Sequence, residues 1–263
     1  MFTYFTETIV LIFLGYSMVY PLLLFITPSN QIDKGFYRFN LGKCCIIGAI
    51  GIIGYHSLST NLYTEIYLLI WFLMLMSITA IYWNSKEANN FIISIISFIG
   101  LLSLRFIIPI IIPNINPDSV FLISILNSLI TSSVFFAMIL GHWYLNVVDL
   151  PINLLKKATL ILSFFLSIRI LWDSIYFFYN YFIDSYGISY NLWSFLFQFE
   201  GFLLGIAFFI GNVFPILLNI FIIRTLKLQA TQSATGLLYV SIVSILFSDL
   251  IFKYYLVQYG FIV

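Results

Sequence analysis

The sequence predicts an all-α, polytopic integral membrane protein with about eight transmembrane helices in one bundle. Hydrophobic residues make up 62% of its 263 positions and Asp, Glu, Lys and Arg only 8%, whereas a soluble globular chain carries about 25% charged residues. A water-soluble fold has too little polar surface to cover so much apolar side chain. Eight apolar stretches joined by short loops fill almost the whole chain, so we expect a single domain over residues 1–263.

Each apolar stretch is expected to be one helix, because about 20 apolar residues cross the hydrocarbon core. The expected spans lie near residues 8–27, 43–60, 64–84, 90–112, 119–145, 157–183, 191–223 and 235–260. The first follows no basic segment of the kind that begins a signal peptide, so we expect it to be retained. The second is short and rich in glycine. The seventh is long enough to tilt, to kink at Pro215 or to extend into the interface.

The loops alternate in charge, and this alternation predicts the orientation. The odd-numbered loops carry the basic residues Lys34, Arg38, Lys43, Lys86, Lys156, Lys157, Arg224 and Lys227. The second, fourth and sixth loops carry Glu65, Asp118 and Asp184 and no Lys or Arg. Because basic loops stay in the cytoplasm, we expect both termini outside a cytoplasmic (inner) membrane. The net charge of +1 gives no electrostatic reason to expect binding to nucleic acid.

Small residues mark two expected helix contacts. Gly48, Gly51 and Gly54 recur every three residues in the second span, and Gly201 and Gly205 form a GxxxG motif in the seventh. Glycine lets helix backbones approach closely in lipid. We therefore expect both faces to pack against neighbouring helices, with room for a flat cofactor or an isoprenoid tail as the alternative.

Six ionisable residues fall inside the expected spans, where a central charge costs about 2.5–3.5 kcal/mol. They are Arg105, Arg169, Asp173, Glu200, Asp249 and Lys253. Arg169 with Asp173, and Asp249 with Lys253, are four residues apart, a spacing that pairs them on one helix face. Arg105 and Glu200 have no oppositely charged partner in their own spans. Each therefore needs a partner on another helix or contact with water, and Glu200 can instead stay protonated. We expect the six to enclose one polar site near the midplane that binds a ligand or relays protons. The alternative is that the pairs only dock the helices.

The two histidines suggest a different chemistry at the membrane surface. His142, with Trp143 and Tyr144, lies at the expected cytoplasmic end of the fifth span, where a titratable ring suits exchange of protons with a quinol headgroup. His56 lies near the outer end of the second span. The depths of the two differ by roughly 14 Å, which disfavours one haem held between them but leaves open a haem with one histidine and another ligand. No ligand spacing predicts a metal site.

The sequence leaves three functions open. It contains no phosphate-binding loop, no dinucleotide-binding fingerprint and no HExxH or GxSxG motif. The leading interpretation is a membrane subunit of a respiratory or electron-transfer complex that meets quinone or relays protons, an enzyme only as part of an oxidoreductase complex with other membrane or redox subunits. A small secondary transporter with a charged midplane site and a non-catalytic structural or assembly subunit are the alternatives.

Overall fold

A computed structural model describes residues 4–59, 61–85, 88–113, 115–147, 150–183 and 187–263. It confirms the all-helical class, with one two-stranded hairpin as the exception among these residues. Seven helical segments are long and apolar enough to cross a membrane: Phe5–Ile26, Lys34–Leu58, Leu62–Tyr82, Asn90–Ile111, Pro117–Asn146, Phe202–Lys227 and Thr231–Tyr259. A multi-pass membrane protein with a lipid environment therefore follows from the fold.

The elements follow one another with short connections. They are α1 (Phe5–Val19), the 3₁₀ helix η1 (Tyr20–Ile26), α2 (Lys34–Leu58), α3 (Leu62–Tyr82), α4 (Asn90–Ile111), α5 (Pro117–Asn146), α6 (Asn153–Tyr179), β1 (Tyr181–Ile183), β2 (Ser189–Asn191), α7 (Leu192–Phe195), α8 (Phe202–Phe208), the π-helix η2 (Phe209–Val213), α9 (Phe214–Lys227) and α10 (Thr231–Tyr259). The 27-residue α6 covers most of the expected sixth span but is not one of the seven apolar segments.

Capping residues explain where several helices begin. The side chains of Asn61, Asn89 and Asn116 accept backbone hydrogen bonds at the starts of α3, α4 and α5, as N-caps do. Asp33 likewise accepts from the backbone nitrogen of Gly35 and starts α2 at Lys34. The expected start of this span at residue 43 is therefore wrong by nine residues, and Lys43 lies on the helix instead of in a loop.

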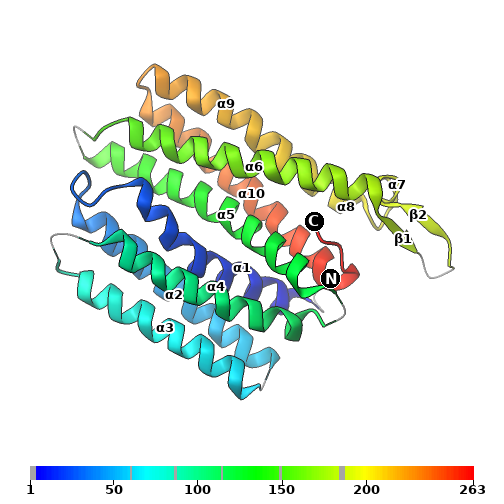
Figure 1. The fold of residues 1–263 in the computed structure, drawn as a ribbon. Coiled ribbons are helices and arrows are strands. Elements are labelled where there is room, and N and C mark those ends of the chain that lie inside the picture. The colour runs from blue at the N-terminus through cyan, green and yellow to red at the C-terminus, as the bar shows by residue number, and fades with distance from the viewer. Residues whose placement is uncertain (1–3, 60, 86–87, 114, 148–149, 184–186) are drawn as a thin grey trace.

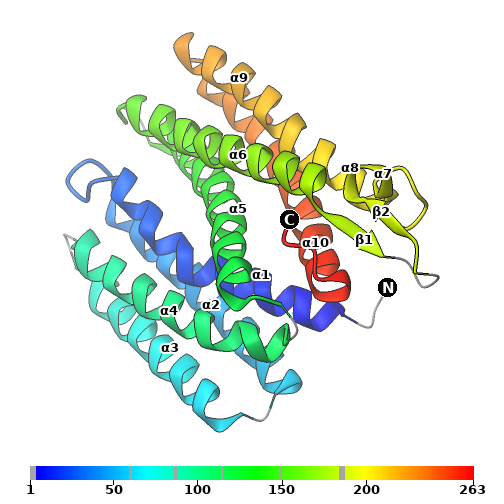
Figure 2. The same cartoon turned by 45° about the vertical axis from the view of Figure 1, so that its right-hand side comes forward.

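The long helices lie side by side, and successive helices run in opposite directions (Figure 1). Figure 2 shows α1 to α4 on one side of the bundle and α6, α8 and α9 on the other. Helix α5 contacts α1, α4 and α6, whereas α10 contacts α1, α5, α8 and α9, so α5 and α10 join the two sides. Both chain ends lie at the same end of the bundle (Figure 1).

The two ends of the bundle differ in charge. The α1–α2, α3–α4, α5–α6 and α9–α10 connections gather at the end opposite the termini (Figure 1). The helix ends at these connections carry Lys34, Arg38, Lys156, Lys157, Arg224 and Lys227. The α2–α3 and α4–α5 connections, flanked by Glu65 and Asp118, lie at the terminal end. Lys86 and Asp184 fall outside the described residues.

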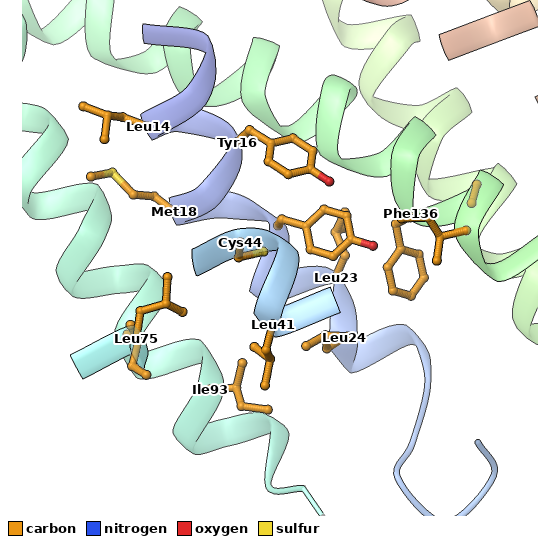
Figure 3. Close-up of a cluster of buried hydrophobic side chains, with 14 of the residues drawn as sticks. Leu14, Tyr16, Met18, Leu23, Leu24, Leu41, Cys44, Leu75, Ile93 and Phe136 are labelled. Carbon is orange, nitrogen blue, oxygen red and sulfur yellow. The ribbon is translucent and has the colours of Figure 1, made fainter. Parts of the chain in front are cut away.

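The glycine face of α2 packs against α1, as expected. A Cβ on Gly51 would stand 2.8 Å from the side chain of Leu14, and one on Gly54 would stand 2.8 Å from Val10. Figure 3 shows Leu14 in the adjoining core, where Leu41 and Cys44 of α2 also lie. Helix α1 fills the face that was the alternative place for a cofactor.

The expected seventh span divides into a short helix with a turn and a long helical segment. Residues 192–201 form the short α7 and a turn, and the long segment begins at Phe202. The GxxxG glycines pack against this turn, since a Cβ on Gly201 would meet the Phe195 carbonyl and one on Gly205 the Leu196 carbonyl. The expected contact of this motif with a neighbouring long helix is therefore wrong.

Candidate functional site

The expected pair on α6 is present and completely buried. Nε of Arg169 lies 2.9 Å from Oδ2 of Asp173, and neither side chain is exposed (0% each). Other helices supply further partners: Arg169 donates to Oδ1 of Asn127 on α5, and Nδ2 of Asn212 in η2 donates to Oδ2 of Asp173 at 2.6 Å. The guanidinium carbon of Arg169 also lies 4.4 Å from the ring centre of Phe252 on α10.

The expected pair on α10 is present as well. Nζ of Lys253 donates to Oδ1 of Asp249, and the side chains are only 1% and 5% exposed. The second carboxylate oxygen, Oδ2, accepts a hydrogen bond of 3.0 Å from the hydroxyl of Thr131 on α5. Each carboxylate therefore has one cationic partner on its own helix and one neutral partner on another.

The two pairs meet around one small cavity between α5, α6, η2 and α10. Arg169 and Asp249 both line it, together with Asn127, Thr131 and Asn212. Its volume of about 10 Å³ is close to the room that one water molecule needs. We call these seven residues the charge cluster: Asn127, Thr131, Arg169, Asp173, Asn212, Asp249 and Lys253.

The charge cluster is deep within the bundle. Arg169, Asp249 and Asn212 each lie at least ten residues from either end of α6, α10 and the segment Phe202–Lys227, which is about 15 Å along a helix. Asp173 and Lys253 are one turn nearer the terminal end. The charge cluster therefore lies near the middle of these helices, far from both ends of the bundle.

A π-helical turn, η2, within the helical segment Phe202–Lys227 builds one wall of the site. Pro215 has no N–H group to bond the carbonyl of Ile210 in the π register, and the hydroxyl of Ser244 on α10 donates to that carbonyl instead. Ser248 donates to the carbonyl of Ala207 at 2.9 Å. Gly211 allows close contact, because a Cβ there would stand 2.0 Å from the side chain of Ser248. Asn212, in this π-helical turn, lies beside Asp173.

Several polar atoms in the charge cluster have no protein partner. Among the described residues, Nη2 of Arg169, Oδ1 of Asp173 and Nδ2 of Asn127 are buried and make no hydrogen bond. A buried polar group without a partner costs free energy. These atoms leave the cluster able to bind a water molecule or to change partners.

The other two ionisable residues do not join the cluster. Nη2 of Arg105 lies 2.6 Å from Oδ1 of Asp118 near the terminal end, where the side chains are 33% and 73% exposed. Glu200 lies exposed in the turn between α7 and α8, and its carbonyl accepts a hydrogen bond from Tyr255. The expectation that Arg105 and Glu200 enclose the same site is wrong, because Arg105 pairs with Asp118 and the chain turns before α8 begins, which leaves Glu200 exposed.

The aromatic interface residues lie apart from the cluster, at the basic end. His142 is exposed and lines an apolar groove of about 410 Å³ with Phe39 and Tyr239. Trp143 lies between this groove and a second one of about 560 Å³. The hydroxyl of Tyr144 donates to the carbonyl of Pro151 in the next connection.

The two histidines belong to opposite ends of the bundle. Nδ1 of His56 lies 2.9 Å from Oε1 of Glu65 across the α2–α3 connection. The C-terminal ends of α2 and α5, which carry His56 and His142, lie at opposite ends of the bundle (Figure 1). One haem cannot reach both.

Sequence reasoning missed the neutral members of the site and one cation. Asn127, Thr131 and Asn212 carry no charge, so the free-energy cost of a charge in the membrane did not single them out as candidates. The only signal in the sequence was an amide or hydroxyl side chain within an apolar helix. Lys43 was assigned to a loop, yet its Nζ lies 3.7 Å from the ring centre of Tyr20 inside the bundle.

Comparisons with family models, with curated proteins and with solved structures gave no match to this chain. Among the described residues, no group of three or more His, Cys, Asp or Glu side chains is placed to hold a metal ion.

Proposed function

We propose that the chain crosses the membrane eight times with both termini outside. Helix α6 is the additional crossing, because its 27 residues extend about 40 Å and the hydrocarbon core is about 30 Å thick. Termini at one end of the bundle require an even number of crossings. The basic connections at the opposite end support a cytoplasmic location for that end.

We infer that the charge cluster relays protons within a membrane subunit of a respiratory or electron-transfer complex. The observation that carries this inference is the meeting of two buried ion pairs around a cavity the size of one water molecule. A proton that binds a carboxylate weakens its hold on the cation, and the neutral partners Thr131 and Asn212 remain to bond the carboxyl group. Such paired acids and bases inside a membrane are typical of proton relays.

The electron-transfer part of the proposal rests on the grooves at the basic end. A quinone has a flat headgroup with two carbonyl oxygens and an apolar tail. The groove beside His142 is apolar, is bordered by the rings of Phe39 and Tyr239, and has one imidazole to exchange a proton with a bound quinol. The groove lies at the basic end of the bundle, which we place at the cytoplasmic membrane surface, where a lipid-soluble ligand enters.

A small secondary transporter is the second candidate, and the π-helical turn η2 favours it. Transporters bind their ions where the regular hydrogen bonding of a helix is interrupted near the midplane, and η2 with Pro215 interrupts the α-helical hydrogen bonding of the segment Phe202–Lys227 beside Asp173. A cavity of about 10 Å³ suits a proton or a small ion and excludes an organic substrate in this conformation. A purely structural role for the ion pairs is the third candidate.

Proton flux into lipid vesicles tests the relay. The purified chain is reconstituted with a trapped pH dye, and a potassium diffusion potential drives protons across the membrane. We expect Asp249→Asn and Asp173→Asn to reduce the flux on the order of a hundredfold, as removal of a positioned proton-transfer group does. Asp118→Asn, the matched change in the exposed pair, should leave it unchanged.

The other outcomes separate the alternatives. Equal flux in all variants, with unchanged melting temperatures, would contradict the relay and favour the structural role. Flux that requires an added solute would favour the transporter. The quinone groove is tested by the quinone that stays bound to the chain in mild detergent. The double variant with His142→Ala and Phe39→Ala should lose this quinone. Tyr63→Ala should retain it, because Tyr63 is an exposed aromatic residue at the opposite end of the bundle.

A further inference from the structure

Lys43 is a half-buried cation that lies against three aromatic rings and lines the groove of about 560 Å³ at the basic end. Its Nζ lies 3.7 Å from the ring centre of Tyr20, 5.3 Å from that of Tyr16 and 5.9 Å from that of Phe135. The nearest polar partner is Oδ1 of Asn40 at 3.5 Å, and this atom also accepts a hydrogen bond from Tyr20. The ion pairs of the described residues do not include Lys43.

This environment suits both forms of the amine. Aromatic faces attract an ammonium group, but without a carboxylate they only partly replace the water that a charge loses on burial. A neutral amine loses little in the same place and still bonds Asn40. A lysine in such a setting gains and releases a proton more readily than one held by an acid.

One face of α5 connects this lysine to the charge cluster. Asn127, Thr131 and Phe135 follow one another at intervals of four residues, about 6 Å per step along the helix axis. Asn127 accepts from Arg169, Thr131 donates to Asp249, and Phe135 is one of the three rings beside Lys43. The ammonium therefore lies about one helical turn beyond Thr131, on the side of the basic end.

Phe135 and Tyr16 occupy the space between the two sites. Phe135 packs against the main core, to which helices from α1 to α10 contribute, and also against the smaller core of α5, α6 and α10, and its ring lies 5.4 Å from that of Tyr16. Figure 3 shows Tyr16 extending from α1 toward α5. The buried hydroxyl of Tyr16 has no partner among the described residues, so it is free to bond a water molecule on this route.

We propose that Lys43 is a second proton-binding site, the station of the relay on the basic side, with Phe135 separating it from the charge cluster. This inference rests on the proposed relay. A proton leaves the ammonium of Lys43 through water bound at the Tyr16 hydroxyl and reaches the carboxylate of Asp249, which leaves a neutral amine and a carboxyl group. The amine then regains a proton from water at the basic end, and no other bond is formed or broken.

Two substitutions of Lys43 test the proposal in the same vesicles. Lys43→Met keeps the length of the side chain and removes the amine. Lys43→Arg keeps the charge and its contact with the rings but holds its proton permanently. We expect both to lower the flux on the order of a hundredfold, with melting temperatures near that of the parent chain. Lys34→Met, a change at the exposed start of the same helix, should leave the flux unchanged.

The results distinguish a failure of the role of Lys43 from a failure of the proposed relay. Parental flux in Lys43→Arg would overturn the proposal, since only the charge would then matter, and so would parental flux in Lys43→Met. If Asp249→Asn stops the flux and both Lys43 variants retain it, only the role of Lys43 falls. If Asp249→Asn also retains it, or the parent chain carries no protons, the relay itself falls.

Discussion

Loss of one partner from the Arg169–Asp173 pair is expected to destabilise the protein far more than the same change in the Arg105–Asp118 pair. Arg169→Met leaves the carboxylate of Asp173, which is 0% exposed, with Asn212 as its remaining partner. Removing one member of a buried ion pair costs about 3–5 kcal/mol, because the other charge stays buried and uncompensated. An exposed pair contributes only about 0.2–1 kcal/mol, and Asp118 is 73% exposed.

The double variant is the sharper part of this prediction. Arg169→Met with Asp173→Leu leaves no unpaired charge at the site, and replacing a buried pair by apolar side chains is neutral or stabilising by about 1–4 kcal/mol. The free energy of unfolding is measured in mixed micelles by SDS titration, with the fluorescence of the five tryptophans as the signal. A single variant as stable as Arg105→Met, or a double variant no more stable than the single one, would refute the reasoning.

Three further predictions concern packing and orientation. Gly51→Val should lower the stability by about 1–3 kcal/mol through overpacking, since a Cβ there meets a backbone nitrogen of α1 at 3.2 Å. Gly236→Ala is the control, because a Cβ there has nothing within 4 Å. Equal melting temperatures of the two variants would contradict the close contact at Gly51. Ser248→Ala should lower the free energy of unfolding by about 0.6–1.7 kcal/mol, the range for hydrogen bonds between membrane helices. An unchanged free energy of unfolding would argue against the hydrogen bond from Ser248 to the carbonyl of Ala207. Single cysteines at Lys227 and Glu65 should react with an impermeant thiol reagent from the cytoplasmic and the outer side, respectively, and labelling of both from one side would exclude the proposed topology.

The sequence predicted correctly those features that the lipid environment constrains directly, namely apolar helix length and the placement of charge. Apolar length fixed most of the helices, and the spacing of four residues predicted both buried pairs. The alternation of basic residues predicted which connections share one end of the bundle. Each of these depends only on local sequence and on the cost of charge in hydrocarbon.

The errors arise where apolar sequence does not continue as a membrane helix. Residues 192–201 include six Leu, Phe and Trp side chains, and the expected seventh span therefore includes them, yet they form α7 and a turn that puts Glu200 on the surface. Asp33 extends α2 backward and brings Lys43 into the bundle. The meeting of the two ion pairs depends on how α6 and α10 pack against α5, which no spacing within one helix reveals.

A structure of the chain in lipid nanodiscs, at a resolution that shows side chains, tests the central claim most directly. The guanidinium of Arg169 should contact Asp173 and the ammonium of Lys253 should contact Asp249, with both pairs around one ordered water molecule in the middle third of the lipid density. Pairs that lie at the level of the headgroups, or that are separated by an apolar layer, would contradict the account.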